Sequence, residues 1–401
     1  MSGVILDLSR LISRVRHSTP SGVDRVEMAY ARGLLRLYGD DLAFAAVHPL
    51  GRYGRLPRKA ALAYLAELER RWSVESGPGH GAPREQSLAS VARWLAVLRP
   101  VGTGIGSGGV YVQVSPHHLT RTAQVRRILA REKARFVCMV HDLVPIEYPE
   151  YARPGGAALH ALRMQTVAET ADAVIVNSAA TGESLRRWLA GRGQDAPPIH
   201  VALLGTEPVA DVEPVKSADG RPFFLCLGTI EPRKNHLLLL HLWRSMAENL
   251  PSSDVPRLVV VGRRGWENEQ VLDLLDRCPG LADHVEEVAN CPDARLAGLL
   301  RGARALLMPS FAEGFGMPVA EALSVGTPVI ASDIDAHREV GGGVPDFCDP
   351  LDGPAWHAAI LDHASRGAMH QAQLARLPQW HAPGWDAHMA IAAAAIEGVR
   401  G

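Results

Sequence analysis

The sequence predicts an α/β protein built from two doubly wound units. Short runs of β-branched and other apolar residues alternate with longer stretches of helical spacing along the 401 residues. Most of these runs are continuously apolar, which is typical of parallel strands covered by helices on both faces. A chain of this length suits two domains of about 150–200 residues each better than one core.

The expected elements follow from this pattern in chain order. The apolar runs predict strands at 3–7, 43–47, 110–114, 135–140, 173–176, 199–203, 222–227, 257–261, 284–288, 304–308 and 327–331. The spacing between them predicts helices at 86–98, 159–170, 236–249 and 267–277, and the alanine-rich tail predicts one at 385–401. The break between the two units is expected near 206–221, which is polar, contains two prolines and lacks periodicity.

Composition excludes several classes of function. The 42 Lys and Arg residues balance 43 Asp and Glu residues, so no global basic field is present to hold nucleic acid. No charge-free run of 18 apolar residues predicts a membrane span, and Asp7 and Arg10 interrupt the only apolar stretch at the N-terminus, so no signal peptide is expected. The five cysteines are scattered without a C-x-x-C pair, which indicates neither a disulfide framework nor a zinc site and favours a reducing cytoplasm.

The most informative segment is 304–342, where a strand leads through a glycine-containing loop into a helix. Pro318 suits the first helical position, and Gly326 is expected to end the helix. Free amides and the helix dipole at such a point favour an anion. Glu313 and Glu321 flank the loop and would repel a phosphate, so we interpret them as acceptors for neutral hydroxyls on either side of it. The alternative is that Glu313 is a loop charge and Glu321 a carboxylate stabilised by the helix dipole.

A second segment, 222–237, ends a buried strand at Gly228 and continues to Arg233 and Lys234 before a helix. Lys234 is one of only four lysines in a chain with 38 arginines. A basic pair at the mouth of a strand–loop–helix unit suits a diphosphate leaving group. A solvated pair at a helix start is the alternative, although cations oppose the helix dipole there.

Two further segments add polar candidates. His141 and Asp142 follow the strand 135–140, where side chains face the crevice at the carboxyl edge of a parallel sheet. His141 could hydrogen-bond a transferred sugar or be a structural histidine, and Asp142 could orient it. Within 18–30, Ser21 and Gly22 open a helix, and Gly22 could bring amides to a diphosphate or simply begin an ordinary N-capped helix.

Together these segments resemble the retaining glycosyltransferases of family 4, which have the GT-B fold. The likeness is strongest at 222–342 and weaker at 1–30, and its most specific motif is the E-x7-E pattern of Glu313 and Glu321. The resemblance implies an N-terminal Rossmann-like acceptor domain at 1–207, a C-terminal Rossmann-like donor domain at 208–380 that faces it across a cleft, and a helix at 381–401 that crosses back, with Trp385 as an anchor.

The resemblance also implies the roles of individual residues. Glu313 would contact the donor hexose and Glu321 the ribose hydroxyls, while His141 would touch the transferred sugar. The family usually has an arginine soon after the glycine and a lysine five or six residues later. Lys234 matches the lysine, but Thr229 stands at the arginine position, so Arg233 would supply that charge. The remaining expected contacts with the nucleotide sugar come from Gly22, Gly228, Thr229, Gly314, Phe315, Gly316 and Met317.

The expected reaction is retaining, metal-independent transfer of a hexose from a nucleotide sugar, with GDP-mannose as the first donor and UDP-sugars behind it. The motif Asp333-Ile334-Asp335 follows the strand 327–331 and is interpreted as loop chemistry rather than a metal site. No cofactor is expected beyond the donor substrate. Cations and helix-terminal amides can stabilise a leaving diphosphate without a metal.

Three other functions remain alternatives. A dinucleotide oxidoreductase would use a G-x-G-x-x-G motif, which 104–109 fits, but this motif precedes the strand 110–114 instead of following one. A sugar-nucleotide epimerase of the same architecture would convert the donor without an acceptor. A non-catalytic sugar-nucleotide binding protein would bind without turnover, and the presence of both site carboxylates argues against it.

The sequence indicates less about the acceptor than about the donor. By resemblance it is a growing glycan or a lipid-linked saccharide in the synthesis of surface polysaccharide. The segment 9–16 has apolar and basic residues at amphipathic spacing and could contact an anionic membrane at its inner face, or be an ordinary surface stretch.

Overall fold

The computed structural model describes residues 3–17, 20–49, 51–74, 87–101 and 109–400. The chain divides into two compact units. Unit 1 comprises the described residues up to Gly205 together with 384–400, and unit 2 comprises Thr206–Pro383. The G-x-G-x-x-G match at 104–109, which belongs to the oxidoreductase alternative, lies outside the described residues except for Gly109, just before a strand.

Unit 1 contains a seven-stranded sheet in the order β3-β2-β1-β4-β5-β6-β7. All neighbouring strands are parallel except β3, which runs antiparallel to β2 at the edge. Its strands are β1 (Val4–Asp7), β2 (Leu42–Val47), β3 (Tyr53–Arg55), β4 (Val110–Gln113), β5 (Arg135–Val140), β6 (Ala173–Val176) and β7 (Ile199–Val201). Its helices are α1 (Ser9–Ser13), α2 (Gly22–Tyr38), α3 (Arg58–Val74), α4 (Leu88–Val97), α5 (Thr122–Glu132), α6 (Val144–Glu147), α7 (Gly156–Thr170), α8 (Ala179–Ala190) and α16 (Trp385–Arg400).

Unit 2 contains a six-stranded sheet in the order β10-β9-β8-β11-β12-β13, parallel throughout. Its strands are β8 (Phe223–Leu227), β9 (Arg257–Val261), β10 (Val285–Val288), β11 (Ala305–Met308), β12 (Val329–Ser332) and β13 (Asp346–Cys348). Its helices are α9 (His236–Asn249), α10 (Glu269–Arg277), α11 (Asp293–Gly302), α12 (Met317–Ser324), α13 (Asp335–Gly341), α14 (Gly353–Ser365) and α15 (Ala368–Arg376).

Every expected strand is present, with ends shifted by one or two residues in several cases. The structure adds β3 and β13, which the sequence analysis missed. Both are edge strands of three residues, Tyr-Gly-Arg and Asp-Phe-Cys, and neither contains the apolar run that marks a covered strand. The fold class is therefore confirmed, and the misses lie where a strand is covered least.

The central strands of both sheets are buried because helices cover both faces. Phe136 and Val174 lie in the core of unit 1, and Phe224 lies in that of unit 2. Trp243 of α9 packs edge-on against Phe224, and its indole nitrogen donates to the carbonyl oxygen of Pro256 at 2.7 Å. Trp243 thereby fixes α9 against the sheet of unit 2.

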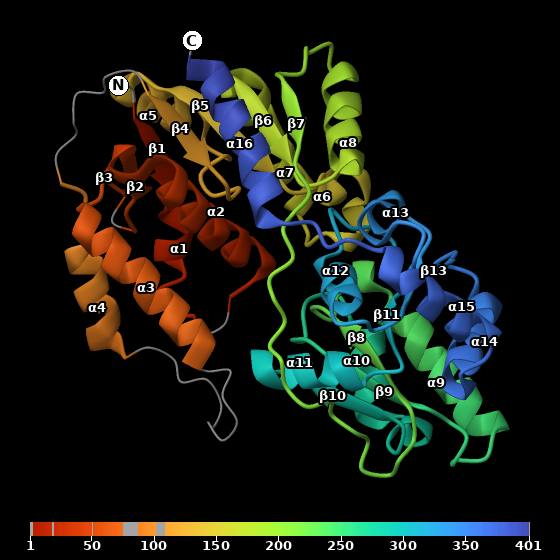
Figure 1. The fold of residues 1–401 in the computed structure, drawn as a ribbon. Coiled ribbons are helices and arrows are strands. Elements are labelled where there is room, and N and C mark those ends of the chain that lie inside the picture. Colours follow the sequence, from red (N-terminus) through yellow and green to blue (C-terminus); the bar gives the residue numbers. More distant parts are fainter. Residues whose placement is uncertain (1–2, 18–19, 50, 75–86, 102–108, 401) are drawn as a thin grey trace. The chain divides into compact units, whose positions relative to one another are not determined.

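The last helix, α16, packs in unit 1 against α2 and β6 (Figure 1). The imidazole of His388 bridges the carbonyl oxygen of Leu203 at 3.0 Å and the hydroxyl of Tyr30 at 2.8 Å. A side chain at Gly205 would overlap Trp385, so the chain leaves β7 in close contact with the start of α16. The C-terminal helix is thus part of the core of unit 1.

The segment 9–16 is not available as an amphipathic surface. Leu11 and Ile12 are fully buried, and Val15 is nearly so. Arg10 pairs with the buried carboxylate of Asp24 at 2.7 Å. The apolar side chains of this segment therefore face the core of unit 1, and a contact with a membrane stays a prediction. Among the described residues, no helix is long and apolar enough to cross a membrane.

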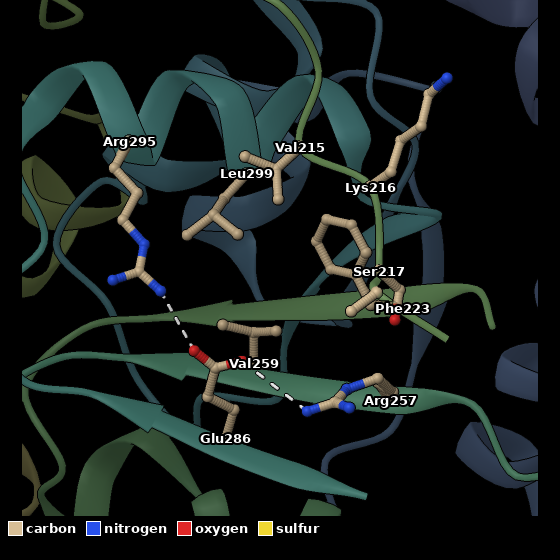
Figure 2. A pocket seen from close by; sticks show the side chains of 10 residues that line it. Val215, Lys216, Ser217, Phe223, Arg257, Val259, Glu286, Arg295 and Leu299 are labelled. Carbon is tan, nitrogen blue, oxygen red and sulfur yellow. Dashed lines mark hydrogen bonds and ion pairs between the residues drawn. The ribbon is translucent and has the colours of Figure 1, made fainter. Parts of the chain in front are cut away.

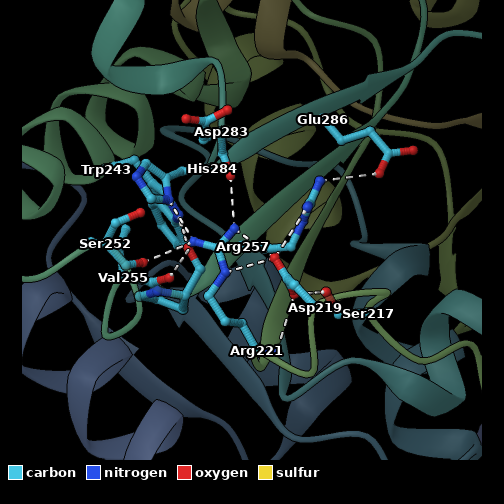
Figure 3. A network of polar contacts seen from close by, with 11 residues as sticks. Ser217, Asp219, Arg221, Trp243, Ser252, Val255, Arg257, Asp283, His284 and Glu286 are labelled. Carbon is cyan, nitrogen blue, oxygen red and sulfur yellow. Dashed lines mark hydrogen bonds and ion pairs between the residues drawn. The ribbon is translucent and has the colours of Figure 1, made fainter.

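Arg221 ties together the amino-terminal edge of the sheet in unit 2 (Figure 3). Its guanidinium pairs with Asp219 at 2.7 Å and donates to the backbone carbonyls of Val255 and Asp283. It also lies 2.7 Å from Nδ1 of His284, and its side chain is only 15% exposed. One side chain therefore joins the segments that begin β8, β9 and β10.

Replacing Arg221 with methionine is expected to destabilise unit 2 by roughly 2–3 kcal/mol, because several partly buried acceptors lose their donor at once. The measurement is urea unfolding followed by circular dichroism. Arg277→Met is the control, since Arg277 pairs with Asp273 on an exposed face of α10 and should cost much less. Equal midpoints for the two variants would contradict this account of Arg221.

Candidate functional site

Two loops meet where the strand order of unit 2 reverses. The chain runs outward from β8 through β9 to β10, and then returns to β11 on the other side of β8. In open α/β sheets, ligands bind beyond the carboxyl ends of strands at such a switch point. The loop 228–235 follows β8, and the loop 309–316 follows β11. The amide of Phe311 donates to the carbonyl oxygen of Arg233 at 2.9 Å, which joins the two loops.

Glu313 lies at the centre of the paired loops. Its Oε1 accepts from Nζ of Lys234 at 2.5 Å and from the hydroxyl of Ser310 at 2.7 Å, while its Oε2 accepts from Nη1 of Arg233 at 2.5 Å. The Glu313 side chain is only 9% exposed. Burial alone would raise the pKa of this carboxyl, but the charges of Arg233 and Lys234 hold it well below its usual range. Glu313 is therefore ionised at neutral pH.

Arg233 is fixed by a second carboxylate. Its guanidinium donates to Oε1 of Glu231 at 2.7 and 3.0 Å and to the carbonyl oxygen of Ala312 at 2.8 Å. Arg233 and Lys234 both lie in the 3-10 turn Pro232–Lys234 before α9. Two cations thus meet two carboxylates, so the charge of the predicted diphosphate clamp is balanced within the protein.

The glycine after β8 makes room for Lys234. Gly228 has φ +138°, and a Cβ there would lie 3.1 Å from Cε and 3.4 Å from Nζ of Lys234. The left-handed backbone and the close approach both favour glycine. The absence of a side chain lets the lysine stem lie against the end of β8. The side chain of the next residue, Thr229, lies close to Gly265.

The helix α12 starts one residue before the position that the sequence predicts. Gly316 is its N-cap with φ +97°, Met317 is the first helical residue, and Pro318 lies in the first turn. Gly326, with φ +79°, follows its end. The amides at the N-terminus of α12 have the partial positive charge that favours an anion. The loop that contains Gly314 and Phe315 leads directly into them.

Glu313 and Glu321 lie on either side of this helix start, as the spacing predicts. Glu321 is partly exposed on α12, and Glu313 precedes the glycines. The Phe315 side chain is buried, so only its backbone could face a ligand. The structure therefore brings together Gly228, Arg233, Lys234 and Glu313, while the roles expected for Glu321 and Met317 remain predictions.

The candidates of unit 1 lie apart from this set in the chain. His141 follows β5, and its Nε2 lies 2.8 Å from the carbonyl oxygen of Val114. Desolvation lowers its pKa, although Val114 and Asp142 act in the opposite direction. The carboxylate of Asp142 accepts from the amide of Val144 at 3.1 Å and so caps the turn that follows. His141 is a neutral histidine at the carboxyl edge of the sheet.

Gly22 is the first residue of α2, and the cap before it is complete. Asp24 Oδ2 accepts from the amide of Ser21 at 2.7 Å, and the Ser21 hydroxyl accepts from the amide of Asp24 at 3.4 Å. This reciprocal capping box is what an ordinary helix start requires. The helix start therefore has the structure that the alternative describes, and Arg10 donates to Asp24 at 2.7 Å. A contact of Gly22 with a diphosphate stays a prediction.

The acidic motif 333–335 is engaged in the protein itself. Asp333 pairs with Arg338, and Asp335 begins α13. Among the described residues, no group of three or more histidine, cysteine, aspartate or glutamate side chains is placed to hold a metal ion. Whether the reaction needs a metal remains a prediction.

Comparisons with known proteins assign this part of the chain to a protein family. The sequence pattern described as "Glycosyl transferases group 1" matches residues 210–342, which contain both loops and α12. The chain carries a glycosyl transferases group 1 domain. The "Serotype-specific mannosyltransferase WbdA" of Escherichia coli is 30% identical over 230 residues, which cover 52% of this chain and 27% of that protein.

A second relative matches a shorter part of the chain, and a solved structure is similar in fold. The "O-antigen chain mannosyltransferase B" of Escherichia coli is 35% identical over 157 residues, covering 38% of this chain and 40% of the relative. The chain thus spans well under half the length of these curated relatives. Sucrose-phosphate synthase from Thermosynechococcus elongatus matches 100% of this chain and 99% of its own with a TM-score of 0.65 at 18% identity. The fold is therefore GT-B, with two Rossmann-like units.

Several residues of the group 1 domain that build the site were missed by the sequence analysis. Ser310 and Glu231 hold Glu313 and Arg233 in place, and Asn235 adopts a left-handed backbone while its amide donates to the carbonyl oxygens of Pro309 and Pro350. None of them stands in a periodic pattern. Glu231 and Ser310 lie on the same loops as their partners, whereas the partners of Asn235 lie on other loops, so only the contacts of Asn235 depend on the tertiary fold.

A separate pocket of about 220 Å³ lies at the amino-terminal ends of the strands of the same sheet (Figure 2). Phe223 and Arg257 begin β8 and β9, whereas the candidate site follows the ends of β8 and β11. Glu286 pairs with Arg295 across the mouth of the pocket at 3.1 Å. The pocket is lined by Val215, Lys216, Ser217, Ala218, Phe223, Arg257, Val259, Glu286, Arg295 and Leu299. Its charged residues serve as matched controls for those of the candidate site.

The low pKa of Glu313 predicts how stability responds to acid. A carboxyl whose folded pKa is depressed contributes stability above its unfolded pKa, here about 4.5, and loses it as the pH falls toward the folded value. Thermal unfolding between pH 7 and pH 3 is therefore expected to show a steeper loss below about pH 5 for the wild type than for Glu313→Gln. Parallel curves for the two proteins would contradict the assignment of this shift to Glu313.

Proposed function

We propose that this chain is a retaining, metal-independent hexosyltransferase. Its first expected donor is GDP-mannose, with UDP-sugars as the next candidates, and its acceptor is a glycan or lipid-linked saccharide. The observation that carries the proposal is the pairing of Glu313 with Lys234 and Arg233 at the switch point of the group 1 domain, beside the N-terminus of α12.

The chemistry follows from the charges at this point. Transfer breaks the bond between the anomeric carbon and the diphosphate oxygen, so negative charge develops on the leaving group. Lys234, Arg233 and the amides ahead of α12 can stabilise that charge, and fixed groups of this kind need no reorganisation during the reaction. Glu313 holds both cations in place. Because its carboxylate is ionised at neutral pH, it could also accept a hydrogen bond from a hydroxyl group of the hexose.

The nature of the sugar and acceptor is proposed from relatives. Two of them are named as mannosyltransferases, and one is named for the O-antigen chain. These names support mannose as the first sugar to test and a growing surface polysaccharide as the acceptor. We further propose that His141 of unit 1 contacts the transferred sugar, and that the protein acts in the cytoplasm, where five unpaired cysteines would stay reduced.

The experiment is a donor panel on the full chain. Purified protein is incubated with GDP-mannose, UDP-glucose and other nucleotide sugars, with candidate saccharide acceptors, and release of nucleoside diphosphate is measured with and without EDTA. Acceptor-dependent release from one donor that survives EDTA is expected. Conversion of the donor without any acceptor would point to an epimerase, and binding without release would point to a non-catalytic protein. Loss of activity with EDTA would overturn the metal-independent step.

The configuration of the product needs a separate measurement. Nuclear magnetic resonance of the product sugar is expected to show the same anomeric configuration as in the donor. An inverted product would leave the transferase activity intact but contradict the retaining mechanism.

A further inference from the structure

His337 is buried directly behind the loop that enters α12. It lies on α13 and has no exposed surface. If Gly316 carried a Cβ, that atom would lie 3.1 Å from Cδ2 and 3.7 Å from Nε2 of His337. The edge of the ring that bears Nε2 therefore faces the side of the loop where Gly316 has no side chain.

The other ring nitrogen fixes the tautomer. Nδ1 of His337 lies 3.0 Å from the carbonyl oxygen of Ser332 at the end of β12. A carbonyl oxygen can only accept, so Nδ1 must carry a proton. Burial lowers the pKa of this imidazole, although the charge of Glu313 acts in the opposite direction, so the ring is neutral at neutral pH. In the neutral ring, Nε2 then has a lone pair and no proton.

That lone pair has no hydrogen-bond partner within the described part of the chain. A buried acceptor without a partner costs about 1–3 kcal/mol, so most buried polar atoms in folded proteins are satisfied. The hydrogen bond from Nδ1 to Ser332 satisfies only one of the two ring nitrogens. The orphaned atom lies beside the loop where a ligand is proposed to bind, which indicates that the missing donor belongs to the ligand.

We propose that Nε2 of His337 accepts a hydrogen bond from a hydroxyl group of the donor sugar. This inference rests on the proposed function. It adds a residue that recognises the sugar of the donor rather than its nucleotide. A phosphate oxygen is a poor partner for this atom, because an unprotonated imidazole nitrogen and an anionic oxygen are both acceptors. A sugar hydroxyl, which donates, is complementary to it. His337 would therefore contribute to sugar recognition, and the cations of the loop to diphosphate recognition.

Two conservative substitutions separate the roles of the ring nitrogens. In His337→Asn, the amide can still donate to Ser332 but nothing reaches the position of Nε2. In His337→Gln, the longer amide can place an oxygen near that position. The full chain is titrated calorimetrically with each nucleoside diphosphate and with the corresponding nucleotide sugar, and circular dichroism confirms that each variant is folded.

His337→Asn is expected to weaken binding of the nucleotide sugar about threefold to tenfold, the range of one neutral hydrogen bond. Binding of the nucleoside diphosphate should change by less than about twofold, and His337→Gln should retain much of the affinity for the nucleotide sugar. Donor analogues that lack one hydroxyl each identify the group concerned, since His337→Asn should weaken every analogue except one.

Equal loss of affinity for diphosphate and nucleotide sugar would show that His337 only supports the loop, and would overturn the proposal. Unchanged affinity for both ligands would overturn it as well. If the wild-type protein binds no nucleoside diphosphate at all, the proposed function fails first, which is a result distinct from a failure confined to the sugar.

Discussion

Glu313→Gln is expected to lower the rate of sugar transfer by about 10²–10³-fold while the protein stays folded. The substitution keeps the size of the side chain but removes the charge that holds Lys234 and Arg233, each 2.5 Å away. The two cations would lose their fixed positions, and the hexose would lose a charged acceptor. Release of nucleoside diphosphate in the presence of donor and acceptor measures the effect.

The matched control for this variant is Glu286→Gln. Glu286 belongs to the same unit and pairs with an arginine, but it lies in the pocket at the amino-terminal ends of the strands (Figure 2). Its rate should stay within about twofold of the wild type, because the residue lies outside the candidate site. A near-native rate for Glu313→Gln would refute the placement of the donor site at this loop.

Lys234→Met is the second variant for which a large loss is expected, again about 10²–10³-fold. Methionine keeps most of the apolar stem that lies against Gly228 but removes the ammonium group. Because the charge is needed most when the diphosphate departs, the loss should fall mainly on kcat rather than on KM. Glu313 would keep Arg233 as a partner, so folding should be retained.

Lys216→Met provides the control for the lysine. Lys216 is exposed, lines the pocket of Figure 2 and is one of the chain's four lysines.

Single-turnover measurements on both variants separate binding from chemistry. A loss confined to KM in Lys234→Met would mean that the lysine binds the diphosphate equally in the substrate and transition states, which would contradict a role in leaving-group stabilisation.

Glu313 has contacts within the protein that its sequence does not predict. Pattern and resemblance assigned Glu313 to the hexose and the basic pair to the diphosphate, as separate contacts with a ligand. In the structure the three side chains contact one another, and Glu231 holds Arg233 from the other side. Sequence spacing cannot reveal this, because Glu231 and Glu313 come from loops about 80 residues apart that meet only when β8 and β11 pair.

His337 illustrates the same limit. It lies two residues after an Asp-x-Asp motif, and that motif predicts a role for the aspartates rather than for the histidine. Asp333 pairs with Arg338, whereas the histidine faces Gly316. The loop that follows β12 lies beside the loop that follows β11 because these strands are neighbours in the sheet. No local signal in the sequence could have indicated this contact.

The amino-acid sequence alone determined the elements and the chemistry that they could carry. Continuous apolar runs required covered parallel strands, and Gly316, Pro318 and Gly326 set the ends of α12, because backbone preference and hydrophobic periodicity act over a few neighbouring residues. The tertiary structure alone decided which loops meet, which cations Glu313 neutralises and which ring nitrogen of His337 is left without a donor. These depend on strand order and burial, which join residues far apart in the chain, so their energies arise only once the sheet of unit 2 is assembled.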